Sequence, residues 1–123
     1  MKRGWNILVV EDEALIAMDL RLRLLQEGAG RVRVVATGEE SIACAAGERF
    51  DLVVMDDHLA GELDGVEAAE RIRSSSQTPI IFISGYPKDE AFLARTARLC
   101  PAAFLDKPID YRRLMAVIDA LPE

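Results

Sequence analysis

Several residues that could do chemistry stand directly after short apolar runs of this sequence. They are Glu11 and Asp12, Asp56 and Asp57, Ser84, and Lys107. If Glu11, Asp12 and Asp56 converge, their carboxylates repel one another and raise one another's pKa values. A hard divalent cation such as Mg²⁺ relieves this repulsion and leaves a coordination position for a phosphate oxygen. An ammonium and a hydroxyl beside it, from Lys107 and Ser84, would form a cradle for a phosphoryl group.

The segments that must position these residues alternate between two kinds. Short apolar or β-branched runs predict strands, and the stretches between them predict helices through apolar spacing or capping residues. The expected strands are 7–10, 32–36, 52–55, 79–83 and 102–105. The expected helices are 14–27, 38–48, 66–73, 88–99 and 111–121. The central strands show no polar alternation, which is typical of a parallel sheet that is buried on both faces.

The alternation predicts an α/β fold with a doubly wound parallel sheet. Ligands of such sheets bind beyond the carboxyl ends of the strands. If the first strand lies between the second and third, strands one and three are about 5 Å apart. Glu11, Asp12 and Asp56 would then meet at one end of the sheet.

Length and composition limit the classes of function. A chain of 123 residues is one domain, and its net charge of −6 disfavours a nucleic-acid-binding surface. No apolar run approaches the roughly 20 residues that cross a membrane. Cys44 and Cys100 lack metal-ligand spacing, and we expect buried thiols in a reducing cytoplasm.

Five segments of the chain together resemble the receiver domains of response regulators in two-component signalling. These segments are ILVVEDE (7–13), DLVVMDD (51–57), DGVEAAERIR (64–73), PIIFISGY (79–86) and FLDKP (104–108). The resemblance implies a five-stranded sheet in the order 2-1-3-4-5, within a flavodoxin-like three-layer sandwich. It covers nearly the whole chain and predicts one receiver domain over 1–123, with its core at about 5–121.

The resemblance also implies residue roles around a bound metal ion. Asp56 would be the phosphoacceptor and a ligand of Mg²⁺, for which Mn²⁺ could substitute. Asp12 would bind the metal directly, and Glu11 mainly through water. The backbone carbonyl of His58 would supply a further oxygen.

A second group of roles concerns the phosphoryl group and the switch. Ser84 and Lys107 would contact the phosphoryl group, and Ser84 and Phe104 would form the conformational switch. His58 and Tyr86 would tune the access of water, although a solvated loop position explains His58 equally well. Ser84-Gly85-Tyr86 departs from the common pattern, in which alanine stands at the position of Gly85.

Asp56 is favoured over Asp57 as phosphoacceptor on physical grounds. Successive side chains of a strand point to opposite faces, so only one of the two can point into the site. Asp56 directly ends the apolar run, and we expect Asp57 to turn away or to cap the following loop.

The resulting hypothesis is a cytoplasmic, phosphorylation-activated switch rather than an enzyme that turns over an external substrate. A sensor histidine kinase or a histidine phosphotransfer protein would supply the phosphoryl group. Output would be protein contact with a downstream target or onward phosphotransfer, and the segments 88–99, 102–105 and 110–121 could form a weak homodimer. No nucleic acid or membrane partner is expected.

Alternatives remain open at this level. The chain could be a pseudo-receiver that binds partners without phosphorylation, or the receiver of a hybrid histidine kinase. A phosphatase of the haloacid-dehalogenase type also uses an aspartate and Mg²⁺. That class expects Asp-x-Asp on the first strand, where this chain has Glu11-Asp12. Neither phosphate-binding glycine motif occurs, which disfavours a nucleotide-binding module.

Overall fold

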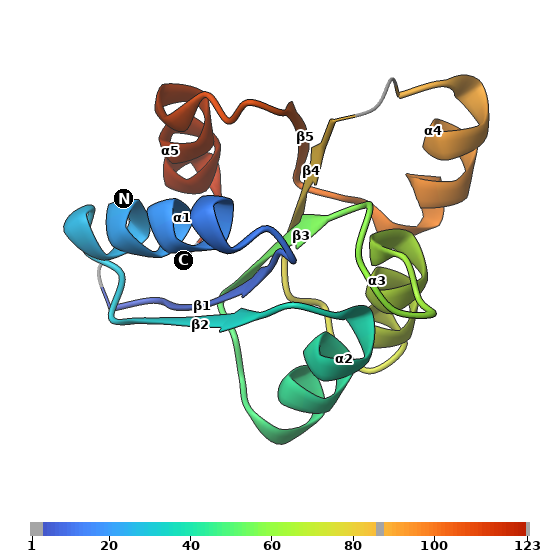
Figure 1. Ribbon diagram of the computed structural model, residues 1–123, viewed down its shortest axis with the longest axis horizontal. Coiled ribbons are helices and arrows are strands. Elements are labelled where there is room, and N and C mark those ends of the chain that lie inside the picture. The colour runs from blue at the N-terminus through green and yellow to red at the C-terminus, as the bar shows by residue number, and fades with distance from the viewer. Residues whose placement is uncertain (1–3, 86–87, 123) are drawn as a thin grey trace.

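Strands and helices alternate along the computed structural model, which describes residues 4–85 and 88–122 (Figure 1). The strands are β1 (Asn6–Val10), β2 (Arg31–Val35), β3 (Leu52–Asp56), β4 (Ile80–Ser84) and β5 (Ala103–Asp106). The helices are α1 (Ala14–Gln26), α2 (Gly38–Gly47), α3 (Gly65–Arg73), α4 (Glu90–Thr96), the 3₁₀ turn η1 (Ala97–Leu99) and α5 (Tyr111–Ala120).

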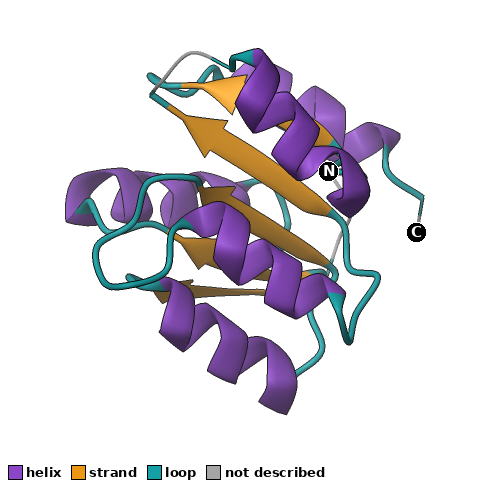
Figure 2. Ribbon diagram, turned by 90° about the vertical axis from the view of Figure 1, so that its right-hand side faces the viewer, coloured by secondary structure: helices purple, strands orange, loops and turns teal. Residues whose placement is uncertain are grey.

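The five strands form one parallel sheet in the order β2-β1-β3-β4-β5. This order confirms the prediction, and β1 lies between β2 and β3. Helices cover both faces of the sheet (Figures 1 and 2). All strands run the same way, so their carboxyl ends share one edge, where ligands of such sheets bind.

The alternation of side chains along each strand creates two hydrophobic cores. Ile7 and Val9 of β1 pack in a core with Leu20 of α1 and Leu114 of α5. Leu8 of β1 packs in the other core, which contains residues of α2, α3 and α4. The α1–α5 face and the α2–α3–α4 face of the sheet are therefore distinct. Whether a residue at a strand end faces one or the other depends on its position in this alternation.

The predicted boundaries are close to the observed ones, with one clear difference at α4. Asp64 and Glu67 form the expected capping box at the start of α3. The predicted helix over 88–99 is shorter, because the Asp89 side chain accepts the Phe92 N–H and starts α4 at Glu90. The last turn tightens into η1, which ends at Cys100 in a left-handed conformation with φ of 47°.

The cysteines are free thiols, but the prediction that both are buried was wrong. Cys44 is half-buried and Cys100 is exposed. Cys100 follows η1, where the chain turns at the surface before β5, and this position explains its exposure. Within residues 4–85 and 88–122, no helix is long and apolar enough to span a membrane.

Candidate functional site

The carboxylates predicted to converge do meet at the carboxyl edge of the sheet. One oxygen from each of Glu11, Asp12 and Asp56 lies within 4.8 Å of the others. Glu11 and Asp56 are each only 3% exposed, whereas Asp12 is open to solvent. β1 and β3 are adjacent in the sheet, so residues 45 positions apart in sequence become neighbours. Three carboxylate oxygens at one edge suit a hard cation such as Mg²⁺.

Backbone groups hold the carboxylates in place. The His58 N–H donates to Oδ1 of Asp56 at 3.1 Å, and the Ala60 N–H donates to Oδ2 of Asp12 at 3.1 Å. Gly65 allows α3 to begin against the end of β3, because a Cβ there would overlap the carbonyl oxygen of Asp56. The loop that follows Asp56 is thus tied to two of the three carboxylates, Asp56 and Asp12.

Lys107 supplies the positive charge within this cluster. Its Nζ atom lies 3.0 Å from Oδ2 of Asp56, 3.0 Å from Oε1 of Glu11 and 3.5 Å from Oε1 of Glu13. Burial lowers the pKa of Lys107, but its hydrogen bonds to Asp56 and Glu11 outweigh this effect and raise the pKa. The lysine therefore remains an ammonium beside these carboxylates.

Glu11 is the carboxylate whose ionisation is most perturbed towards neutral pH. Its pKa rises to about 7, chiefly because burial removes water from the carboxylate and also because Asp56 lies next to it. The Glu13 N–H, which donates to Oε2 of Glu11 at 3.1 Å, and the Lys107 ammonium oppose the shift. A divalent cation would favour the ionised form of this cluster.

Ser84 and Asp57 lie on the opposite side of the strand ends from Asp56. Asp56 continues the alternation of Val54 on the α1–α5 face, whereas Asp57 and Ser84 continue that of Met55 and Phe82 on the other face. The Ser84 hydroxyl donates to Oδ2 of Asp57 at 2.9 Å. Burial raises the pKa of Asp57, and the bond from Ser84 partly offsets the rise.

This bond refines the expectations for both residues. Asp57 does turn away from the site, as predicted, but its side chain meets Ser84 rather than capping the next loop. Ser84 ends its strand beside the site, while its hydroxyl is directed to Asp57. The pair of Ser84 and Asp57 was not predicted from the sequence, although both residues continue the same face of their strands, and this shared position was a signal for the contact.

A pocket of about 320 Å³ opens over Asp56 and Lys107, and Glu13, His58 and Gly85 complete its lining. Gly85 has no side chain at this part of the lining, and a Cβ there would lie 3.8 Å from the Lys107 side chain. Of the two residues predicted to tune water access, His58 borders this pocket, and Tyr86 lies outside the described residues.

Phe104 is part of an aromatic cluster on the same face as Ser84. Its ring stacks on Phe82 with centroids 5.8 Å apart, and it meets Phe92 of α4 edge-on at 5.5 Å. Such pairs are stabilised by the quadrupoles of the rings as well as by burial. Phe104 thus connects β5 and β4 to helix α4.

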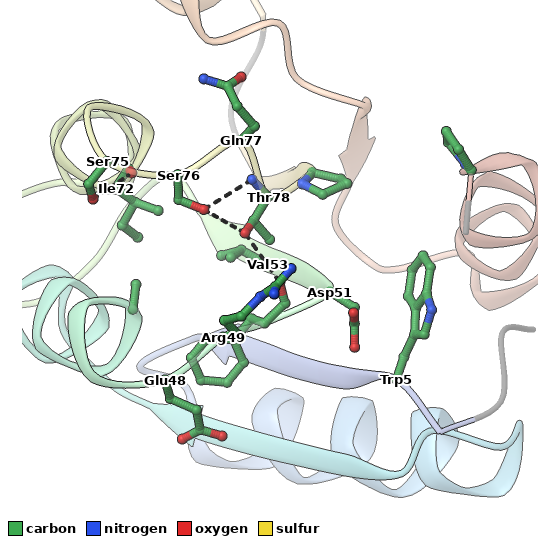
Figure 3. Close-up of a pocket in the computed structure, with 14 residues that line it drawn as sticks. Trp5, Glu48, Arg49, Asp51, Val53, Ile72, Ser75, Ser76, Gln77 and Thr78 are labelled. Carbon is green, nitrogen blue, oxygen red and sulfur yellow. Dashed lines mark hydrogen bonds between the residues drawn. The ribbon is translucent and has the colours of Figure 1, made fainter.

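A second hollow of about 500 Å³ lies at the opposite edge, where the strands begin (Figure 3). Its lining includes Trp5, Glu48, Asp51, Ser76 and Thr78. Much of its polarity is already used within the fold: Glu48 and Asp51 accept hydrogen bonds from Asn6, and the hydroxyls of Ser76 and Thr78 lie 2.7 Å apart. The chemistry of interest is therefore at the carboxyl edge.

Comparisons with known proteins identify the family to which the chain belongs. Residues 7–119 match the family model "Response regulator receiver domain". The chain is 35% identical over 115 residues to the transcriptional regulatory protein PdtaR of Mycobacterium tuberculosis, covering 93% of this chain and 55% of PdtaR. It is 37% identical over 116 residues to the phyllosphere-induced regulator PhyR of Methylorubrum extorquens, covering 92% of this chain and 42% of PhyR. The chain thus spans about half the length of these curated relatives.

Solved structures show the same fold. The signal receiver domain of a modulated diguanylate cyclase from Desulfovibrio desulfuricans is 36% identical with a TM-score of 0.85, covering 94% of this chain and 90% of that one. The response regulator TrrA from Thermotoga maritima, solved in complex with Mg²⁺ and BeF, is 26% identical with a TM-score of 0.82, covering 94% and 96%. By sequence, fold and the clustering of its acidic residues, this chain belongs to the response-regulator receiver domain family.

Proposed function

We propose that this receiver domain is a Mg²⁺-dependent switch that accepts a phosphoryl group on Asp56. The observation that carries the proposal is the joint placement of the buried Asp56 carboxylate, two further acids and the half-buried Lys107 ammonium at one edge of the sheet, beside a pocket that Asp56 and Lys107 line. Asp56 is the buried carboxylate that both contacts Lys107 and lines that pocket, whereas Glu13, which does the same at a longer distance, is exposed. Asp57 is not among the lining residues of that pocket, and its side chain accepts the Ser84 hydroxyl on the other side.

The reaction is the transfer of a phosphoryl group from a phosphohistidine. A carboxylate oxygen of Asp56 attacks phosphorus, the P–N bond breaks, and the histidine leaves as a neutral imidazole once its ring carries one proton. The Lys107 ammonium lies where it can neutralise charge on the transferring group. Glu11, Asp12, Asp56 and the carbonyl of His58 would hold Mg²⁺, which when bound supplies further positive charge. The complex of TrrA with Mg²⁺ and BeF supports this chemistry in a relative.

The acyl phosphate would act as the switch by adding charge and acceptor oxygens near Ser84. Movement of the Ser84 hydroxyl towards it would free space beside the aromatic cluster and allow Phe104 to repack against Phe92 of α4. Hydrolysis would reset the protein. Since His58 borders the pocket, we expect His58→Ala to change the dephosphorylation rate, and an unchanged rate would contradict this role.

An exposed apolar stripe on α1 is suited to a protein phosphodonor. Leu15, Met18 and Leu22 are 83%, 60% and 53% exposed, and their spacing places them on one side of the helix. Leu15 also lines a small pocket together with Lys107, so the stripe reaches the phosphoryl site. A helix of a histidine kinase or of a phosphotransfer protein could dock here and present its phosphohistidine.

Output is proposed to be contact with a downstream protein or onward phosphotransfer. PdtaR and PhyR are regulators that are longer than this chain, so a receiver within a larger protein, such as a hybrid kinase, also fits the match. No turnover of an external substrate is expected. Intact Asp12, Asp56 and Lys107 argue against a pseudo-receiver.

Intact-mass measurement tests the proposal. The protein is incubated with Mg²⁺ and acetyl phosphate or phosphoramidate, with EDTA in a parallel sample. We expect a phosphate-sized increment that disappears in EDTA and in Asp56→Asn but persists in Asp51→Asn, which alters an exposed carboxylate at the other end of the same strand. A mass increment that persists in Asp56→Asn would show that another residue accepts the phosphoryl group. No increment with any donor would favour the pseudo-receiver.

A further inference from the structure

The hydrogen bond between Ser84 and Asp57 joins two neighbouring strand ends on the face opposite the phosphoacceptor. Ser84 Oγ lies 2.9 Å from Oδ2 of Asp57, and the backbone supports this approach because the Asp57 N–H donates to the Ile83 carbonyl at 3.2 Å. The Ser84 carbonyl is held as well, by the Lys107 N–H at 2.9 Å. The backbone of Ser84 is thus fixed on both sides, and rotation of its side chain is what can redirect the hydroxyl.

The Asp57 carboxylate depends on this bond for its hydrogen bonding. Its Oδ1 atom is buried without a hydrogen-bond partner among the residues that the structure describes, and Oδ2 is the atom that accepts from Ser84. A hydrogen bond from a hydroxyl to a carboxylate is roughly twice as strong as one between neutral groups. Releasing Ser84 leaves a half-buried carboxylate with less compensation, which favours the resting arrangement.

A serine hydroxyl has a single hydrogen, so it donates to one acceptor at a time. We propose that Asp57 is a positioning residue that holds Ser84 away from the phosphoryl site, so that a phosphoryl oxygen on Asp56 must compete with the Asp57 carboxylate for the same hydroxyl. This inference rests on the proposed function. It adds that the bond to Asp57 must be broken before Ser84 can contact the phosphoryl group. The second acid of the Asp56-Asp57 pair sets how readily phosphorylation turns the switch on.

The competition for the Ser84 hydroxyl predicts that weakening its bond to Asp57 favours the phosphorylated arrangement. Asp57→Asn keeps the shape of the side chain but replaces the carboxylate with a neutral amide, which weakens the hold on the hydroxyl hydrogen and can instead donate to Ser84 Oγ. The phosphorylated arrangement should then form more easily. Removal of a negative charge near the phosphoryl group would act in the same direction, however, so the experiment must separate the two causes.

A double-mutant cycle with a phosphoryl mimic makes this separation. The dissociation constant of fluoroberyllate is measured by calorimetry in the presence of Mg²⁺ for the wild type, Asp57→Asn, Ser84→Ala and the double variant. Competition predicts that Asp57→Asn binds about tenfold more tightly, as expected for a weaker competing bond. In the Ser84→Ala background the same substitution should change binding less than twofold. Glu62→Gln, which removes one exposed charge from the same loop, should match the wild type.

Two results would overturn the inference while leaving the proposed function intact: equal binding by Asp57→Asn and wild type, or the same tightening with and without Ser84. The second would show that Asp57 acts through its charge alone. Failure of the wild type to bind fluoroberyllate would overturn both proposals.

A metal-free measurement gives an independent readout. In ¹H–¹⁵N spectra recorded with EDTA, the Ser84 amide of Asp57→Asn should shift from the resting position towards the position seen in the fluoroberyllate-bound wild type. An unchanged Ser84 amide shift would contradict the proposal that Asp57 holds Ser84 in its resting position. Asp57→Ala, which offers Ser84 no acceptor, should shift it further, and Trp5 fluorescence during thermal unfolding verifies that each variant is folded.

Discussion

The ammonium of Lys107 lies 3.0 Å from Oδ2 of Asp56, although the two residues are 51 positions apart in sequence. The carboxylate is 3% exposed and the lysine side chain 17% exposed, so little water separates or screens the pair. In such an environment an ion pair is costly to break, because each charge then remains without a partner. Lys107 therefore offsets the negative charge of the buried carboxylates, and by the proposed function the same ammonium contacts a phosphoryl oxygen.

Lys107→Met should destabilise the metal-free protein by about 3 kcal/mol, because it leaves Asp56 and Glu11 without their counter-charge. Mg²⁺ should recover part of this loss by supplying positive charge to the same carboxylates. The measurement is urea unfolding followed by Trp5 fluorescence, with EDTA or Mg²⁺. Lys88→Met is the matched control, since its partner Asp106 is exposed, and it should have a smaller effect that Mg²⁺ does not reverse. Equal effects of the two substitutions would contradict the role of Lys107.

Glu11 should make stability depend on pH when no metal is bound. Its pKa of about 7 in the folded protein exceeds the ordinary value of 4.5, so the folded state holds this proton more tightly than the unfolded state. The stability that Glu11 contributes is present below pH 4.5 and is lost as the pH rises through about 7.

Glu11→Gln replaces the titrating carboxyl with a neutral amide, and comparison with the wild type isolates the contribution of Glu11 to stability. Relative to the wild type, the variant should gain stability progressively between about pH 4.5 and pH 7 in EDTA. Unfolding free energies at several pH values test this. A difference between variant and wild type that does not change with pH would rule out the raised pKa. In the wild type, Mg²⁺ binding should weaken as the pH falls below 7, because protons compete for Glu11.

Phe104→Ala should both destabilise the protein and disconnect α4 from the site. The substitution removes a half-buried ring that contacts Phe82 and Phe92, at a cost of about 2–3 kcal/mol. When fluoroberyllate binds, amide shifts in α4 should be smaller than in the wild type, while shifts near Asp56 persist. Phe104→Leu should retain more stability. Undiminished α4 shifts in Phe104→Ala would show that the response takes another route.

Substitutions in the exposed apolar stripe on α1 should slow phosphorylation by a protein donor but not phosphorylation by a small-molecule donor. Leu15→Gln with Met18→Gln is expected to slow phosphotransfer at least about tenfold from the histidine kinase that phosphorylates the wild type fastest, since central apolar contacts carry much of the binding energy. Phosphorylation by acetyl phosphate should be unchanged. Leu93→Gln, an exposed apolar residue on α4, serves as the control. Equal slowing with both donors would indicate damage to the site instead of lost docking.

Much of the architecture follows from local patterns that act over a few residues. Apolar runs such as 52–55 and capping pairs such as Asp64 and Glu67 act through neighbouring atoms, so they predict strands and helix starts directly. The placement of acids and Lys107 after these runs was sufficient to predict where the site lies, because parallel strands end at a common edge. The extent of α4 was predicted less well, since the Asp89 cap competes with a longer helix.

Only the tertiary structure decided which partners these residues have. Asp56 and Asp57 are chemically identical in the sequence, but the alternation of β3 places one beside Lys107 and the other beside Ser84. Contacts across such separations depend on strand register and on the face that each side chain takes, and both are set by the packing of helices on the two sides of the sheet. The sequence by itself therefore determined the set of reactive groups and the edge they occupy, whereas folding decided which acid meets the ammonium and which holds the serine.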